Sequence, residues 1–207
     1  AVDYHMHTVH TDGTASTQEM ADAAVSNGIH EVLFSEHVRH TSTYYPGFVD
    51  EVRKLNSSDL KIYVGVETKV LDTDGRLDCS NQIADLSDAI LGSVPSPPMD
   101  GNGVAGSWSR MDAETALELE FQLALAIATN SQAHVLAHPM GMAVTRFKLQ
   151  PLEHLYTLAC ACRDADKAFE LNARYCSSPK DWLDIVRRAG CKVSFASDAH
   201  KTSDVGS

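Results

Sequence analysis

The hexapeptide VDYHMH, residues 2–7, is a predicted strand that carries two histidines and runs into a polar turn, TDG at residues 11–13. Alternate residues of a strand face the same side, so His5 and His7 can bind one cation together. A helix follows the turn, since STQE at residues 16–19 forms a capping box and a glycine supplies the stop signal. This unit, with metal-ligating residues at the carboxyl end of its strand, sets the pattern for the chain.

The strand–helix unit recurs along the whole sequence. Short apolar segments predict seven strands, over residues 2–7, 31–35, 61–66, 89–94, 134–137, 168–171 and 192–196. Helices are predicted between them, over residues 16–27, 46–55, 81–86 and 113–128, from near residue 151, and over 179–189. Strands that alternate with helices are typical of a parallel sheet with helical crossovers, either open and doubly wound or closed into a barrel. The one long irregular stretch, residues 95–110, is rich in Gly, Pro and Ser, and we expect it to form a loop over the site.

Length and composition indicate one α/β domain that spans residues 1–207. No apolar run is long enough to cross a bilayer and no signal peptide opens the chain, so we expect no membrane partner. The five cysteines form no disulfide framework, which favours free thiols in a reducing cytoplasm. The first residue is not Met, and we expect the chain to be trimmed or to belong to a longer product.

The formal net charge of −11 argues against nucleic acid as a partner, because phosphate backbones attract basic surfaces. It leaves small phosphorylated substrates open, since bound divalent cations can invert the sign of the local field. Charge therefore disfavours a nucleic-acid-binding protein without excluding phosphate chemistry.

Metal-ligating side chains stand at the carboxyl ends of five of the seven predicted strands, the edge where parallel α/β folds place their active sites. In chain order they are His5, His7, His10, Asp12, Glu36, His37, Glu67, His138, Asp198 and His200. Imidazole with carboxylate suits Zn, Mn or Fe. A carboxylate such as Glu67 can bridge two ions that stabilise the attacking and leaving oxygens of a phosphoryl displacement. The repetition of these residues at strand ends favours a metal centre, with His10 and the loop residue His40 left undecided.

Several motifs around these residues resemble those of the PHP (polymerase and histidinol phosphatase) domain superfamily. In chain order they are DYHMHT at residues 3–8, TDG at 11–13, SEH at 35–37, GVE at 65–67, LGSV at 91–94, AHP at 137–139 and SDAH at 197–200. They span essentially the whole chain, and ELN at residues 170–172 together with the DAH ending is most similar to the histidinol-phosphatase branch. The resemblance implies a distorted (β/α)7 barrel, a TIM-like α/β fold that agrees with the seven predicted strands. We expect it to be truncated at the C-terminus, before a closing helix.

The resemblance also implies a trinuclear metal site. One ion would be held by His5, His7, Glu67 and Asp198, a second in part by Glu67 and His138, and a third by Asp12, His37 and His200. The family usually has a histidine after Gly-Ser-Val, where this sequence has Pro95, which offers no side-chain ligand. The second ion would then bind weakly, take extra water or be absent, and Asp100 is a candidate replacement ligand. We therefore expect two or three divalent transition metals per chain, as Zn, Mn or Fe.

These residues lead us to expect a hydrolase that acts on a small phosphate monoester, as histidinol phosphatases do. Asp198, His200 and His37 are the candidates for catalytic proton transfer. Arg146 and Arg174 are the candidates for substrate binding, because an arginine can bind a phosphate through two parallel hydrogen bonds.

Three other functions stay open. Some PHP domains attached to DNA polymerases resemble phosphodiesterases or exonucleases, although the negative charge and the lack of a basic, aromatic-lined path disfavour strand binding. Pro95 also permits a metal-binding domain with reduced or no catalysis. An amidohydrolase-like enzyme would share the H-x-H motif of the first strand, but it normally has eight strands and a modified Lys, and no clear Lys stands at a predicted strand end.

Overall fold

Seven parallel strands form the sheet of this protein, and each is hydrogen-bonded to the next in chain order. The structure is a computed structural model that describes residues 1–99 and 106–207. Its strands are β1 (Val2–Met6), β2 (Glu31–Val38), β3 (Lys61–Lys69), β4 (Ala89–Ser93), β5 (Val135–Leu136), β6 (Ala168–Asn172) and β7 (Lys192–Ala196). Its helices are α1 (Thr17–Ser26), α2 (Tyr45–Val52), α3 (Asn81–Leu86), α4 (Ala113–Asn130), α5 (Gly141–Thr145), α6 (Leu152–Asp164) and α7 (Pro179–Ala189), with the 3-10 turns η1 (Trp108–Arg110) and η2 (Thr202–Asp204). Within the described ranges, no helix has the length and apolar character needed to cross a bilayer.

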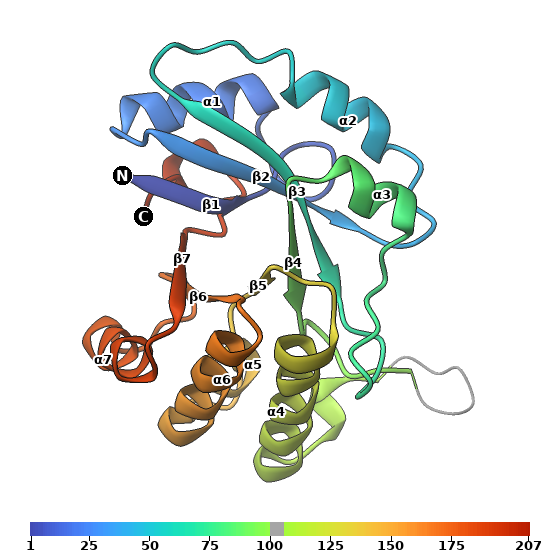
Figure 1. Ribbon diagram of the computed structural model, residues 1–207, viewed down its shortest axis with the longest axis vertical. Coiled ribbons are helices and arrows are strands. Elements are labelled where there is room, and N and C mark those ends of the chain that lie inside the picture. Colours follow the sequence, from blue (N-terminus) through green and yellow to red (C-terminus); the bar gives the residue numbers. More distant parts are fainter. Residues whose placement is uncertain (100–105) are drawn as a thin grey trace.

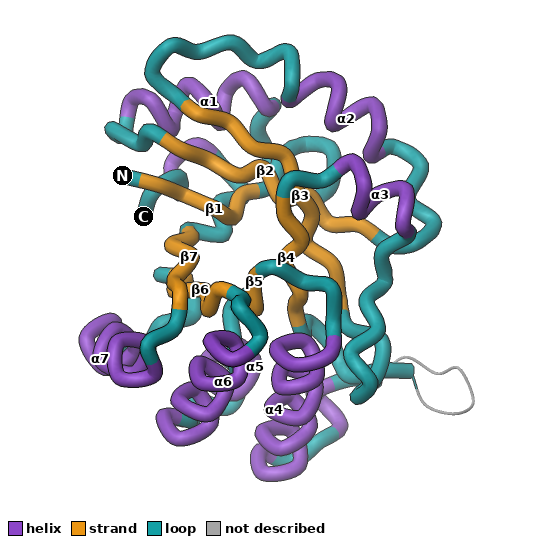
Figure 2. The backbone as a smooth tube through the Cα atoms, in the orientation of Figure 1, coloured by secondary structure: helices purple, strands orange, loops and turns teal. Residues whose placement is uncertain are grey.

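The sheet curls into a nearly closed barrel with the helices outside. Helices α1, α2 and α3 cover one side, and α4, α5, α6 and α7 cover the other (Figure 1). Figure 2 shows the strands arranged in a ring, in which the last strand, β7, comes back to the side of the first strand, β1. At this seam Met6 pairs in parallel with Ala199, and the His7 amide donates to the Ala199 carbonyl at 2.8 Å. The predicted seven-stranded barrel is therefore confirmed.

The predicted strands are all present, and they differ from prediction mainly at their carboxyl ends. β2 and β3 run further than predicted, so His37 and Glu67 lie within the sheet rather than after it. β5 is shorter than predicted, since the chain turns away near His138, whose φ is 28°. The predicted caps are confirmed, because Ser16 accepts from the third residue of α1 and Asp112 from the third residue of α4. The short helix α5 is an element that the sequence does not predict.

An apolar layer inside the barrel supports the polar layer at its carboxyl end. Leu33, Leu91 and Val135 form a small buried cluster that faces the barrel interior, apart from the larger core between sheet and helices. Alternate strand residues share a face, so Leu33 and His37 of β2 both point into the barrel interior. In the neighbouring strand β3, Glu67 is in register with His37 and lies at the same end of the barrel. The strand pleat alone therefore brings ligand-type side chains to one end of the barrel.

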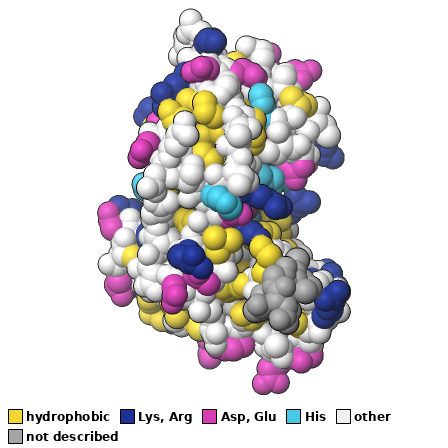
Figure 3. All heavy atoms as spheres, turned by 90° about the vertical axis from the view of Figure 1, so that its right-hand side faces the viewer, with side chains coloured by type: hydrophobic (Ala, Val, Ile, Leu, Met, Phe, Trp, Pro, Cys, Tyr) yellow, Lys and Arg dark blue, Asp and Glu magenta, His cyan; other side chains and the backbone are white. Residues whose placement is uncertain are grey.

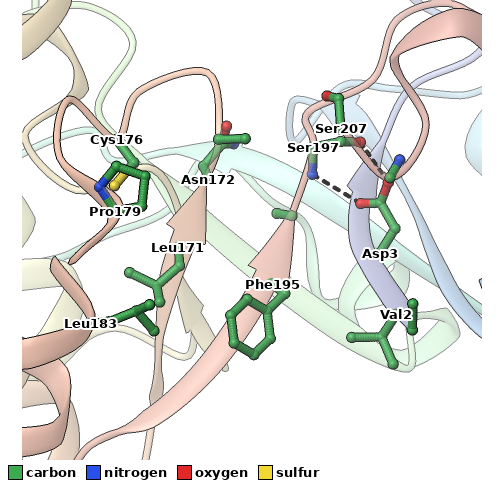
Figure 4. Close-up of a pocket in the computed structure, with 14 residues that line it drawn as sticks. Val2, Asp3, Leu171, Asn172, Cys176, Pro179, Leu183, Phe195, Ser197 and Ser207 are labelled. Atoms are coloured by element: carbon green, nitrogen blue, oxygen red, sulfur yellow. Dashed lines mark hydrogen bonds between the residues drawn. The ribbon is translucent and has the colours of Figure 1, made fainter.

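The seam between β1 and β7 is fastened by Asp3, a carboxylate that is only 1% exposed. It accepts hydrogen bonds from the Ser197 amide at 3.0 Å, from the Ser197 hydroxyl at 2.5 Å and from the Gly206 amide at 2.9 Å. Figure 4 shows Asp3 on β1 pointing towards Ser197, while Val2 and Phe195 line the adjacent apolar cavity of about 530 Å³. These bonds hold the histidines of β1 against the residues that follow β7.

Replacing Asp3 by Asn is expected to lower the free energy of unfolding by about 2–4 kcal/mol, because charge-assisted hydrogen bonds are lost and an amide group then meets backbone N–H donors. Urea denaturation followed by circular dichroism measures the change. Asp59→Asn, at an exposed position, is the control and is expected to change stability by less than about 0.5 kcal/mol. Equal stability of Asp3→Asn and the unaltered chain would show that the seam does not depend on this carboxylate.

Candidate metal centre

The carboxyl end of the barrel gathers four buried donor groups, called here the inner cluster: His5, His7, Glu67 and Asp198. His5 Nε2 lies 3.1 Å from His7 Nε2 and 3.2 Å from Glu67 Oε2, which is 3.4 Å from His7 Nε2. Asp198 Oδ1 lies 3.6 Å and 3.3 Å from the Nε2 atoms of His5 and His7. A tetrahedral zinc ion with ligands at about 2.0–2.1 Å would separate its donor atoms by about 3.3–3.4 Å. The inner cluster therefore fits one cation of this size.

A second group, the outer cluster, consists of His7, Asp12, His37 and His200, whose donor atoms all lie within 4.8 Å of one another. Asp12 Oδ1 is 3.4 Å from His37 Nε2 and 3.3 Å from His200 Nε2. The side chains of Asp12 and His37 are 56% and 44% exposed, so this cluster is open to solvent where the inner one is buried. Histidine side chains are visible on the molecular surface beside acidic and basic ones (Figure 3). A second cation held here would be within reach of a substrate.

Glu67 connects the two clusters. Its Oε2 atom faces His5 and His7 and also lies 3.0 Å from His37 Nδ1, while its Oε1 atom lies 2.9 Å from His138 Nε2. Burial alone would raise the pKa of this carboxyl, but the neighbouring histidines His5, His138 and His37 hold the pKa well below its ordinary value. Glu67 is therefore an ionised carboxylate whose Oε2 atom faces donors of both clusters, while its Oε1 atom faces His138.

The backbone leaves the sheet in an unusual conformation at two of these side chains. His138 has a φ of 28° and Asp198 a φ of 54°, values that residues with a Cβ rarely adopt. The His138 amide is held in this turn by a hydrogen bond to Glu170 Oε1 at 3.1 Å. Such strain persists where the surrounding structure imposes it, and it is often found at functional sites.

Glu170 is a site residue for which the sequence predicts no role of its own. It is fully buried on β6, and its Oε2 atom lies 2.9 Å from His5 Nδ1. Asn172 donates to its other oxygen at 2.8 Å. A carboxylate on Nδ1 keeps the proton there and leaves Nε2 free to bind a metal. The sequence offers one signal for Glu170, which is its position in the strand. Residues 170 and 172 are two apart, so both side chains lie on the face of β6 that points into the barrel.

Glu36 supports the site without joining either cluster. This fully buried carboxylate accepts from the Thr8 amide at 2.6 Å, from the Thr8 hydroxyl at 2.5 Å and from the Thr11 hydroxyl. These bonds fix the turn that precedes Asp12. Glu36, which the sequence offers as a candidate ligand, is thus a structural residue of the β1–α1 connection.

The two undecided histidines also lie outside both clusters. His10 Nε2 is 3.0 Å from Glu51 Oε2, and His40 Nδ1 is 2.7 Å from Asp78 Oδ1. Each imidazole is thus engaged with an acid that belongs to neither cluster.

The two arginines predicted to bind phosphate are placed differently. Arg174 Nη1 lies 3.5 Å from Asp198 Oδ2, and the residue lines a cavity of about 630 Å³ together with His200 and Lys201. Arg146 is exposed beyond the end of α5, and no hydrogen bond or ion pair of the described residues connects it to either cluster. Arg174 therefore lies beside the inner cluster, whereas Arg146 does not.

The position between Glu67 and His138 has fewer donors than the two clusters. Among the residues that the structure describes, His138 forms an ion pair only with Glu67. Pro95 is exposed, and its carbonyl accepts from the indole N–H of Trp108 at 3.0 Å. Asp100, the candidate replacement ligand, lies outside the described residues. The described residues fit one ion at each cluster, and beside His138 they offer only the carboxylate of Glu67.

Comparison with known proteins relates this centre to a family. The sequence profile of the PHP domain matches residues 3–174. The DNA polymerase/3'-5' exonuclease PolX of Bacillus subtilis is 27% identical over 183 residues, which make up 83% of this chain but 29% of that protein. This chain thus spans less than a third of the length of that relative.

Two solved structures share the fold. The proposed histidinol phosphatase hisK of Listeria monocytogenes matches with a TM-score of 0.78 at 16% identity, over 100% of this chain and 97% of that one. The histidinol phosphate phosphatase of Lactococcus lactis, solved with zinc, L-histidinol and phosphate, matches with a TM-score of 0.72 at 19% identity, over 97% and 86% of the two chains. At these identities the likeness establishes the shared barrel.

Glu170→Gln is expected to weaken metal binding by about 10–100-fold, because the amide no longer fixes the proton on His5 Nδ1. Competition with a fluorescent chelator measures the affinity for Zn²⁺. Glu153→Gln, an exposed position on α6, serves as the matched control and should bind as the unaltered chain does. Unchanged affinity in Glu170→Gln would mean that His5 is oriented without this carboxylate.

Proposed function

Because the chain belongs to the PHP domain family, we propose that it is a metal-dependent phosphoesterase that hydrolyses a small phosphate monoester. The observation that carries the proposal is the pair of adjoining donor clusters, which share His7 and are connected by Glu67. Histidine and carboxylate donors together suit Zn, Mn or Fe. Cations held by the buried inner cluster and by the exposed outer cluster would together favour a phosphoryl group at the mouth of the barrel.

Different side chains of the chain have different roles in the proposed reaction. Divalent cations, when bound, lower the pKa of a water ligand and stabilise charge on the attacking and leaving oxygens. Arg174 lies beside Asp198, where its guanidinium can bind phosphoryl oxygens. Asp198 lies beside Arg174, His200 lies beside Asp198, and His37 lies beside Asp12. These three side chains are our candidates for moving protons. The His200 Nδ1–H donates to the Asp198 carbonyl at 2.8 Å, which directs its Nε2 towards Asp12.

The substrate class follows from size and from fold likeness. The cavity of about 630 Å³ beside Arg174 is within the range of about 300–1,000 Å³ that is typical of small-molecule sites. The Lactococcus structure of the same fold holds L-histidinol and phosphate. We propose a substrate of this kind, a phosphorylated small alcohol, for the present chain.

A second candidate is phosphodiester or exonuclease activity. It is favoured by the relative of 27% identity, a DNA polymerase/3'-5' exonuclease. The net charge of −11 opposes it, because a polynucleotide would be repelled outside the immediate centre. The two activities differ in the ester that is cleaved, so one assay separates them.

The setting of the activity is a further part of the proposal. We take residues 1–207 as one hydrolase domain that works in a reducing compartment such as the cytoplasm. The cysteines in the described part of the chain are all free thiols, as expected there.

The chain reconstituted with Zn²⁺ or Mn²⁺ is expected to hydrolyse p-nitrophenyl phosphate and L-histidinol phosphate faster than bis-p-nitrophenyl phosphate. His5→Ala should lower kcat/KM for the monoesters by at least about 10³-fold. The inner cation would lose a ligand, and the carboxylates of Glu67 and Glu170 would lose the imidazole that they contact. Release of p-nitrophenol and of inorganic phosphate gives the rates.

His30→Ala, at an exposed position away from both clusters, should retain full activity. Preference for the diester would replace the monoesterase proposal by the exonuclease type. A metal-loaded chain without activity on either ester would instead indicate a non-catalytic binding domain.

Arg174→Ala is expected to raise KM for the monoester by about 10–100-fold, since a charge-assisted contact with phosphate contributes about 1.5–3 kcal/mol. Arg146→Ala should leave KM unchanged. Steady-state kinetics on p-nitrophenyl phosphate measure both. The opposite ranking of the two variants would reassign the phosphate-binding arginine.

A further inference from the structure

The donor groups of the centre fall into two sets rather than three. In the described part of the chain, the groups of three or more donors close enough to hold an ion are the outer cluster and the trio of His5, His7 and Glu67, which Asp198 joins. His138 belongs to neither group. A catalytic zinc ion normally has three protein ligands, so a histidine with a single neighbouring carboxylate offers too few.

Among the described residues, the end of β4, which is the strand next to His138, provides no donor to a metal. Pro95 has no ligand atom in its side chain, and its carbonyl already accepts the indole N–H of Trp108 at 3.0 Å. On the other side of His138, both oxygens of Glu170 are engaged, one with His5 and the other with the His138 amide. The remaining face of the His138 ring is covered by Tyr175, with ring centroids 4.8 Å apart.

His138 has another task that this geometry allows. Its Nε2 lies 2.9 Å from Glu67 Oε1, so an Nε2–H donates a hydrogen bond to that oxygen. The other oxygen, Oε2, is then turned towards His5 and His7. A hydrogen bond that orients a ligating carboxylate is worth about 10–100-fold in metal affinity.

We infer that this chain binds two divalent ions rather than three, because the described end of β4 lacks a donor, and that His138 is a positioning residue that orients Glu67 instead of a metal ligand. The inference deepens the proposed function and rests on it for the metal centre itself.

Metal stoichiometry tests the count without reference to activity. The full chain, stripped with chelator, is equilibrated with Zn²⁺, freed of excess by gel filtration and analysed by elemental mass spectrometry. Two ions per chain are expected for the unaltered protein and for His30→Ala. Three ions would overturn the inference and leave the proposed function standing. No bound ion would overturn both.

Two substitutions separate the roles of a ligand and of a hydrogen-bond donor at position 138. His138→Gln keeps an N–H donor for Glu67 but is a poor zinc ligand, whereas His138→Asp keeps a good ligand and removes the donor. We expect Gln to retain two ions with affinities within about 3-fold of the unaltered chain, and Asp to weaken the inner ion by about 10–100-fold. The reverse order would show that His138 is a ligand.

Pro95→His supplies the donor that β4 lacks, and it is expected to raise the count to three ions. Adding His138→Ala to Pro95→His should return the count to two. A count of two in Pro95→His alone would overturn the assignment of the missing donor to the end of β4. Circular dichroism melting of each variant confirms that it is folded before its metal is counted.

Discussion

The structure depends on keeping Glu67 ionised among buried histidines. A charge removed from water is tolerated only where neighbouring groups compensate for the lost hydration. His5 provides this compensation for Glu67. Burial alone would lower the pKa of His5, but the carboxylates of Glu170 and Glu67 raise that pKa well above its ordinary value. The Nδ1 atom of His7 is buried without a hydrogen-bond partner among the described residues. Ligands of this kind give up protons when a cation enters, so metal binding and the stability of the barrel end are coupled.

The position of these groups depends on the closure of the barrel. His5 and Glu170 are separated by 165 residues in the sequence, and Asp3 and Ser197 by 194. Without the Asp3 seam, β1 would be an edge strand and its histidines would lose the neighbours that follow β7. The metal centre is therefore a property of the closed sheet, and no single strand–helix unit contains it.

Much of the fold is predictable from the sequence because it follows from local rules. Strand segments between capped helices identify the seven strands, and the caps at Ser16 and Asp112 mark two helix starts to the residue. The strand pleat also predicts which residues share the carboxyl edge. This explains why the residues of both clusters could be named in advance as candidates.

The rest was not predictable because it depends on contacts between distant segments. Asp3 and Glu170 are acids whose partners lie far away in the sequence, so the strand pattern can place their side chains on a face but cannot identify what they bind. Arg146 and Arg174 look alike in the sequence, since both follow a strand end, and only the path of the chain after β5 and β6 separates them. The shortness of β5 likewise depends on the left-handed turn at His138, which is held from another strand by Glu170.

Charge balance at the centre connects the ion count to the substrate. Asp12, Glu67 and Asp198 bring three carboxylates to the two clusters, and Glu170 adds a fourth beside His5, so the two divalent cations that we propose would balance them. Arg174 adds one more positive charge beside Asp198. A phosphate monoester carries close to two negative charges at neutral pH, whereas a diester carries one. A centre with the two proposed ions and one arginine would thus keep a positive charge that attracts a phosphate ester, within a chain whose overall negative charge would repel a long polyanion.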